Sequence, residues 1–115
     1  MPRLQPGEIW KVALSDVEGH EQAGDRPAIV ISIYPQANVT MVVPLTKNLD
    51  CLRFPYSFQV KKSNTNGLSW DSVALIYQMR CLTASSTRFL DKMGVIEQNH
   101  FDQIKLLIKS YLKIP

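Results

Sequence analysis

The chain has 115 residues, 45% of them hydrophobic, and a formal net charge of +3 at neutral pH. This length and apolar content favour one globular domain, residues 1–115, with a core of its own. No apolar run approaches the roughly 20 residues of a membrane-spanning helix, and the N-terminus has no apolar segment typical of a secretory signal. Two cysteines, Cys51 and Cys81, are too few for a disulfide scaffold or a zinc site, so we expect free thiols in a cytoplasmic protein.

The charge is unevenly distributed along the chain. Residues 1–25 carry two basic and five acidic side chains, whereas residues 26–92 carry eight basic and three acidic ones. A basic segment attracts polyanions through electrostatic steering and counterion release. Charge alone fits an ordinary solvated surface equally well, so it does not identify a partner.

Short apolar segments separated by polar turns predict a series of strands. In chain order the expected strands are residues 8–14, 27–33, 39–45, 56–60 and 72–77, then 78–82 as a continuation or a separate strand beyond a bend, with a short strand or helical turn within 85–93. Residues 15–25 form a long polar loop, and loops of this length inside compact domains are often functional.

The C-terminal segment changes to a helical period. Phe101, Ile104, Ile108 and Tyr111 share one face of a helix, and Lys109 near its end complements the helix dipole. Many short strands followed by one helix predict a small, mostly β barrel closed by a helix.

The entry into the second predicted strand presents a cation. Pro27 suits the first position of a strand, and the β-branched run Ile29–Ile31 predicts a strand that is buried on both faces. Arg26 therefore stands at the mouth of a stiff strand, beside a loop that contains a histidine and a carboxylate. A guanidinium grips phosphate oxygens with a planar fork, so this arrangement suits phosphate chemistry. An ion pair of Arg26 with Asp25 or Glu21 is the alternative.

Several short motifs occur in a characteristic order: Gly7-Glu8-Ile9-Trp10, the loop Gly19-His20-Glu21-Gln22-Ala23-Gly24, Arg26-Pro27, Pro44-Leu45-Thr46, Asp71-Ser72-Val73, and Gln78 with Arg80. From about residue 7 to 112, the chain resembles the MazF/PemK (Kid) toxins of toxin–antitoxin pairs. The resemblance implies an SH3-like barrel of the CcdB/PemK type that forms a homodimer. It also implies a sequence-selective endoribonuclease of single-stranded RNA that works without a metal or other cofactor, and an antitoxin partner with an acidic C-terminal segment.

RNA cleavage agrees with the residues that are present. The sequence has no metal-ligand motif, phosphate-cradling glycine loop or nucleophile elbow, and RNA supplies its own nucleophile in the 2′-OH. The resemblance assigns catalysis to Arg26, Thr46 and Glu21, with Glu21 either the general base or a partner that positions Arg26. For Thr46, a hydrogen bond within its own turn is the alternative. We expect the RNA-binding residues to be His20, Gln22, Lys47, Asn48, Gln78 and Arg80.

The sequence departs from the resembled family at Tyr77 and Leu75, where the PemK branch has its proton-transfer pair. This departure motivates a second reading, in which the chain is a non-catalytic toxin that inhibits a topoisomerase, as CcdB does, or a relative that only binds an antitoxin. Tyr77 either stacks on a base or is a buried strand tyrosine. Trp10 and Trp70 either stack on RNA or pack in the core or a dimer interface, and packing is the expectation for both.

Overall fold

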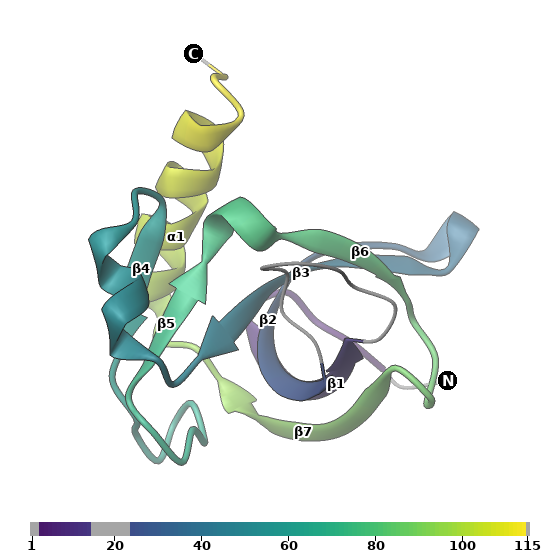
Figure 1. Cartoon of the computed structure of the whole chain (residues 1–115). Helices are drawn as coiled ribbons and strands as arrows, with labels where there is room; N and C mark the ends of the chain where they lie inside the picture. The colour runs from purple at the N-terminus through teal and green to yellow at the C-terminus, as the bar shows by residue number, and fades with distance from the viewer. Residues whose placement is uncertain (1–2, 15–23, 115) are drawn as a thin grey trace.

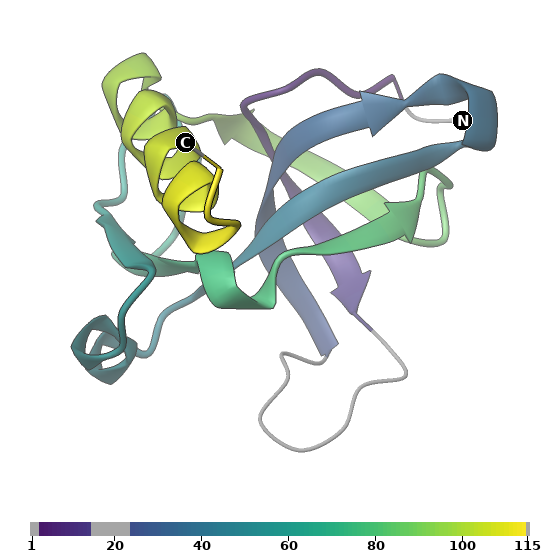
Figure 2. The same cartoon turned by 90° about the horizontal axis from the view of Figure 1, so that it is seen from above.

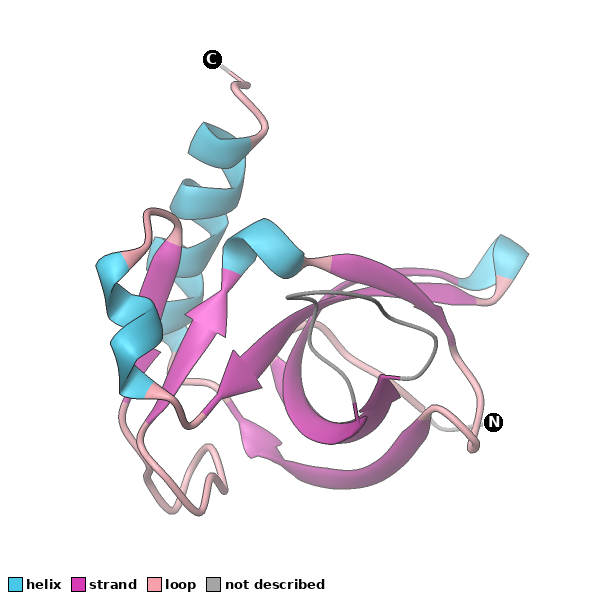
Figure 3. Cartoon of the chain, viewed as in Figure 1, coloured by secondary structure: helices cyan, strands magenta, loops and turns pink. Residues whose placement is uncertain are grey.

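The structure is a computed structural model that describes residues 3–14 and 24–114. It is mostly β with one C-terminal helix, which confirms the predicted fold class (Figure 1, Figure 3). The strands are β1 (Glu8–Leu14), β2 (Gly24–Tyr34), β3 (Val39–Thr46), β4 (Ser57–Val60), β5 (Ser72–Leu75), β6 (Arg80–Thr83) and β7 (Phe89–Val95). Three short 3-10 helices, η1 (Pro35–Ala37), η2 (Leu49–Arg53) and η3 (Ile76–Gln78), interrupt them, and α1 (Gln98–Tyr111) follows.

The strands form one curled sheet in the order β4-β5-β3-β2-β1-β7, with β6 also paired to β3. The pairings among the described strands are all antiparallel. Figures 1 and 2 show α1 beside η3 and β5, away from the hairpin turn that joins β2 to β3. The helix covers this end through Phe101 and Ile104, which are buried in the same core cluster as Leu45 and Ile76.

Strand β2 divides two apolar clusters, because its successive side chains point to opposite faces. Ile29 belongs to the cluster that α1 covers, whereas Val30 belongs to a second cluster with Val12 and Val42. Ile29 and Val30 are both fully buried. The prediction of a strand buried on both faces is therefore confirmed.

β5, η3 and β6 follow one another along one edge of β3. The predicted strand over residues 72–77 is wrong beyond Leu75, where β5 ends. Ala74 pairs with Leu45 and Arg80 pairs with Val42, so the five residues 75–79 face only residues 43–44. The residues in excess do not pair with β3 and form η3 instead. Pro44 has no N–H with which to hydrogen-bond them to β3. As a result, Tyr77 lies in a 3-10 turn rather than in a strand.

Candidate active site

Arg26 and Thr46 occupy equivalent positions on two neighbouring strands. Ala28 on β2 pairs with Pro44 on β3, and Arg26 and Thr46 each stand two residues beyond that pair. The β2–β3 pairing ends at that pair, and because side chains alternate along a strand, both residues lie on the face of Ala28 and Pro44. Arg26 is half-buried and its backbone pairs with Val12 on β1. Arg26 and Thr46 therefore follow the same end of the β2–β3 ladder, where β2 continues against β1 and β3 continues against β5.

The hydroxyl of Thr46 is held in a fixed position. Thr46 is buried, its backbone pairs with Val73 on β5, and its Oγ1 accepts a hydrogen bond from the backbone N–H of Asn48 at 3.2 Å. This is the turn hydrogen bond that was the alternative to a catalytic role. It occupies a lone pair of the oxygen, so the hydroxyl hydrogen is still able to donate to a phosphate oxygen.

Gln78 and Arg80 lie on the other edge of β3 from Arg26. Gln78 ends η3, and Arg80 begins β6 opposite Val42, so both flank the strand that carries Thr46. Both side chains are half-buried. The predicted RNA-binding pair and the predicted catalytic arginine thus lie on opposite sides of Thr46.

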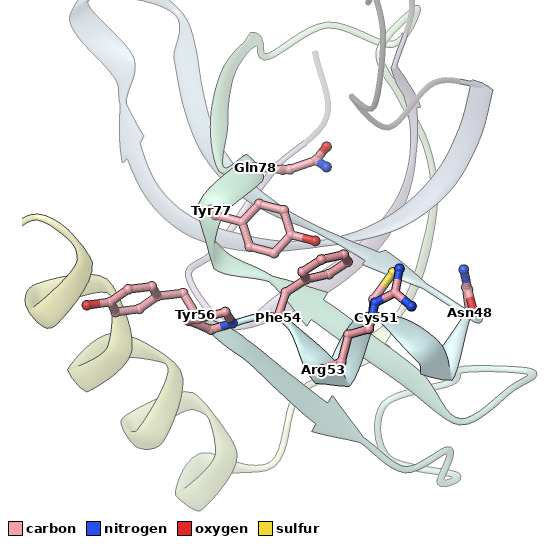
Figure 4. Close-up of a pocket in the computed structure, with 8 residues that line it drawn as sticks. Asn48, Cys51, Arg53, Phe54, Tyr56, Tyr77 and Gln78 are labelled. Atoms are coloured by element: carbon pink, nitrogen blue, oxygen red, sulfur yellow. The ribbon is translucent and has the colours of Figure 1, made fainter.

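A hollow of about 930 Å³ opens beside this group (Figure 4). Tyr77 contacts Phe54 edge to face in it, with ring centroids 6.2 Å apart. Of its lining residues, the sequence predicted RNA binding for Asn48 and Gln78 and gave stacking on a base as one of two readings of Tyr77. The described residues that line it are Asn48, Cys51, Arg53, Phe54, Pro55, Tyr56, Tyr77 and Gln78.

The phenol of Tyr77 cannot act as a base at neutral pH. Burial, and to a lesser extent the neighbouring Cys51, raise the pKa of Tyr77 above its ordinary value of about 10. The hydroxyl therefore stays protonated and serves as a hydrogen-bond donor. The proton-transfer carboxylate of the PemK branch has no functional substitute at this position.

A second hollow of about 390 Å³ is lined by Arg26, Lys47 and Trp70 among other residues. The Lys47 ammonium lies 5.2 Å from the centroid of the Trp70 ring. Trp70 is 62% exposed in the single chain, so it does not pack in the core, and its packing in a dimer interface stays a prediction. Core packing is confirmed for Trp10, which packs edge to face on the buried Phe89.

The remaining sequence predictions concern the loop residues, the cysteines, metal binding and membrane helices. Glu21, His20 and Gln22 lie outside the described residues. Cys51 and Cys81 are free, as predicted. Within residues 3–14 and 24–114, no three His, Cys, Asp or Glu side chains gather as a metal site requires. No helix of the described segments has the length and apolar character needed to cross a membrane.

The fold defines a class of small proteins in which one curled, antiparallel sheet is covered at one end by a C-terminal helix. The chain matches, over residues 5–112, the family described as the PemK-like, MazF-like toxins of type II toxin–antitoxin systems. It therefore belongs to that family, and the resemblance seen in the sequence is confirmed.

Named relatives and solved structures agree with this assignment. Endoribonuclease MazF9 of Mycobacterium tuberculosis is 32% identical, with 96% of this chain and 98% of the relative covered. Endoribonuclease MazF of Staphylococcus epidermidis is 25% identical, with 94% and 95% covered. Among solved structures, MazF of Deinococcus radiodurans superposes with a TM-score of 0.81 at 19% identity, covering 96% of this chain and 97% of that one.

Proposed function

We propose that this toxin is a sequence-selective endoribonuclease that cuts single-stranded RNA and leaves a 2′,3′-cyclic phosphate and a 5′-hydroxyl. The observation that carries the proposal is that Arg26 and Thr46 each stand two residues beyond the last pair of the β2–β3 ladder, on neighbouring strands. A cation and a hydroxyl donor so placed suit the two non-bridging oxygens of a single phosphodiester. The relatives named as endoribonucleases support the same activity.

The reaction follows from the chemistry of RNA. A base removes the 2′-OH proton, the 2′-oxygen attacks the adjacent phosphorus, and a pentavalent phosphorane forms. The Arg26 guanidinium stabilises the charge that develops on the phosphorane oxygens, and the Thr46 hydroxyl donates to one of them. The bond to the 5′-oxygen then breaks as that oxygen takes up a proton. Glu21 is our sequence-based candidate for the base, because Tyr77 remains protonated.

The partners follow from the family. Solved relatives include an endoribonuclease in complex with its cognate antitoxin from a mycobacterial species, with a TM-score of 0.74 at 15% identity, covering 98% of each chain. We place this toxin in the cytoplasm as a homodimer of single-domain chains that meets RNA and an antitoxin with an acidic C-terminal segment. Its basic middle segment, residues 26–92, complements both anionic partners.

Cleavage of a long single-stranded RNA in excess EDTA tests the proposal directly. Arg26→Ala is expected to reduce the cleavage rate about 10²- to 10³-fold while the protein stays folded, because it removes a preorganised charge from the phosphate. Arg3→Ala removes an exposed arginine from the N-terminal segment and is the matched control. End-group analysis must show a cyclic phosphate. Equal rates for Arg26→Ala and wild type overturn the proposal.

A non-catalytic toxin is the second candidate, and Leu75 and Tyr77 favour it. Leu75 is fully buried and apolar, and Tyr77 holds its proton, so neither replaces the acid–base pair of the PemK branch. Inhibition of a topoisomerase with no RNA cleavage establishes this alternative. Antitoxin binding with neither cleavage nor growth arrest indicates a degraded relative.

A further inference from the structure

The turn between β4 and β5 holds a fully buried asparagine, Asn66, that is followed by Gly67. We infer that Asn66 is a site of spontaneous deamidation that is closed in the folded chain and open in the unfolded chain, and that the modified chain no longer folds stably. The modification limits how long a chain that unfolds can return to the active toxin. It does not depend on the proposed ribonuclease function.

The dipeptide Asn66-Gly67 meets the sequence requirement of the reaction. The backbone nitrogen of Gly67 loses its proton and attacks Cγ of Asn66, the Cγ–Nδ2 bond breaks, and ammonia leaves behind a cyclic succinimide. Water then opens the ring at either carbonyl and gives aspartate or isoaspartate. Glycine favours the attack because it has no side chain and its backbone rotates freely. The other four asparagines of the sequence precede residues with side chains, namely Val39, Leu49, Thr65 and His100.

The fold directs the nucleophile away from the side chain. The Gly67 N–H donates to the carbonyl oxygen of Ser63 at 3.0 Å. After deprotonation, the electron pair of this nitrogen lies along the former N–H direction, so it faces and is repelled by the Ser63 oxygen. The Asn66 Oδ1 accepts the backbone N–H groups of Ser63 and Leu68, each at 3.0 Å. These donors polarise the amide carbonyl, but they also prevent it from turning toward Gly67.

The leaving group and the water are controlled as well. The Asn66 Nδ2 donates to the Lys61 carbonyl oxygen at 2.8 Å and to the two carboxylate oxygens of Glu97 at 3.2 and 3.4 Å. Asn66 is 0% exposed, so water has no access to a succinimide at this position. In the folded chain the reaction therefore requires the turn to open first.

The same contacts make aspartate unfavourable at this position. A carboxylate has no hydrogen to donate. It would therefore face the Lys61 carbonyl oxygen and the Glu97 carboxylate with acceptors on both sides. Glu97 already accepts from the Ser63 hydroxyl at 2.6 Å, which holds its carboxylate in place. A fully buried charge that faces acceptors and a like charge is strongly destabilising.

Isoaspartate is unfavourable because of the backbone. It adds a methylene to the main chain at residue 66, in the turn that lies beside the end of β7 in Figure 1. A Cβ at Gly94 would lie 2.5 Å from the carbonyl carbon of Asn66, and the Thr65 carbonyl oxygen accepts the N–H of Val95 at 2.9 Å. A longer backbone does not fit this close crossing, so neither product suits the native structure.

Peptide mapping of aged protein tests the site. Wild type is kept at mildly alkaline pH in buffer or in guanidinium chloride and then digested with trypsin, which releases residues 63–80 with both Asn64 and Asn66. We expect Asn66 to convert faster than Asn64 in the denaturant, and at least about 10²-fold more slowly in buffer, because the turn must open. Equal rates for Asn66 in the two solutions, or faster conversion of Asn64 in the denaturant, overturn the inference.

Gly67→Ala tests the chemistry in guanidinium chloride, where the native fold plays no part. The added methyl group obstructs the attack, so conversion of Asn66 is expected to slow several-fold, and an unchanged rate contradicts the role of Gly67. After dilution of the denaturant from aged wild type, the refolded fraction is expected to retain intact Asn66. Refolded chains as rich in modified residue 66 as the whole sample overturn the inference.

Asn66→Asp tests the effect of the aspartate product on folding. We expect it to lower the equilibrium constant for folding about 10²-fold or more, up to complete loss of the fold. Asn64→Asp makes the same charge change at an exposed position of the same turn and is expected to fold like wild type. Denaturant titration measures both variants. Equal stability of the two shows that the modification is harmless and overturns the inference.

A double variant tests the contact with Glu97 and does so even if Asn66→Asp alone fails to fold. Asn66→Asp combined with Glu97→Gln exchanges the amide and the carboxylate across this contact. The new amide can donate to the new carboxylate, so part of the lost stability is expected to return. A double variant that is no more stable than Asn66→Asp contradicts the repulsion assigned to Glu97.

Discussion

The Thr46 hydroxyl and the Asn48 backbone N–H are joined by a hydrogen bond of 3.2 Å at the end of β3. This bond orients the hydroxyl and also connects the phosphate site to the hollow lined by Asn48. The hydrogen bond of Thr46 within its own turn does not exclude a catalytic role for the hydroxyl. The hydrogen bond prepositions the Thr46 hydroxyl for catalysis, since its oxygen needs no reordering when the phosphate binds.

Thr46→Val separates the two roles of this hydroxyl, because valine keeps the shape and removes the oxygen. We expect the cleavage rate to fall about 10²-fold or more, and the free energy of unfolding to fall by only about 1 kcal/mol for the lost hydrogen bond. Thr46→Ser retains the hydroxyl and is expected to keep most of the activity. Rates on a long RNA and urea denaturation measure the two effects. If valine is as active as serine, Thr46 has only its structural role.

Lys47 provides a test of the predicted RNA path. Its ammonium lies over the exposed Trp70 ring, at the hollow that Arg26 also lines. Lys47→Met keeps an unbranched apolar side chain without the charge, and is expected to reduce the slope of log K against log salt by about 0.7, the value for one phosphate of a single strand. Lys109→Met, on the exposed face of α1, is the control and is expected to leave the slope unchanged. An unaltered slope for Lys47→Met removes this residue from the RNA path.

The lowered pKa of Glu8 predicts how the free energy of unfolding depends on pH. Its buried carboxylate accepts from the Trp10 indole N–H and the Gln5 backbone N–H and pairs with Lys92 at 2.9 Å. Burial raises the pKa of Glu8, but these partners outweigh burial, so the pKa lies below its ordinary value of about 4.3. The stabilisation is complete above about pH 4.3 and is lost as the pH falls through the lower, folded-state pKa.

Glu8→Gln is therefore expected to destabilise the protein at neutral pH. It is also expected to flatten the acid limb of the stability curve, that is, the fall in the free energy of unfolding as the pH is lowered. Part of that limb remains, because hydrogen bonds from Ser63 and Asn66 and the nearby His100 overcome burial and lower the pKa of Glu97 too. Urea denaturation from about pH 7 to about pH 3 measures the curve. The control is Asp102→Asn, which removes an exposed carboxylate 3.7 Å from Lys105. An acid limb in Glu8→Gln as steep as in wild type contradicts the role of this carboxylate.

Gly94 allows a close crossing of two backbone segments. A Cβ at Gly94 would lie 2.5 Å from the carbonyl oxygen of Thr65, and a Cβ at Gly67 would overlap the carbonyl of Met93. Gly94→Ala is expected to lower the free energy of unfolding by about 3 kcal/mol, because backbone rather than a flexible side chain must move. Ser86→Ala, at an exposed turn, is expected to stay within about 0.5 kcal/mol of wild type. Calorimetry or urea denaturation that finds both variants equally stable refutes the close crossing.

The sequence predicted most of the strands because their apolar patterns are local. Residues 8–14 match β1, and the predicted second and third strands match β2 and β3 to within a few residues. The error at 72–77 has a nonlocal cause. Residues 72–77 are apolar enough for a longer strand, but the ladder on β3 leaves no partners for residues 76–78, and no single-segment pattern contains that information.

The candidate active site could be predicted from the sequence only where a motif marked its residues. Arg26 and Thr46 came from the resemblance, and each stands two residues beyond the last pair of the β2–β3 ladder. The hollow was not predictable, because it brings Arg53 and Phe54 of η2 against Tyr77 of η3, two turns whose contact depends on packing.

The surplus residues of η3 have a consequence for diversification within this family. They leave the sheet between two regions of regular pairing, so the half-buried Tyr77 and Gln78 can change while the ladder on either side keeps its register, whereas Ile76 is held in the core. A lineage can thus retune this loop beside Thr46 without rebuilding the barrel that holds Arg26.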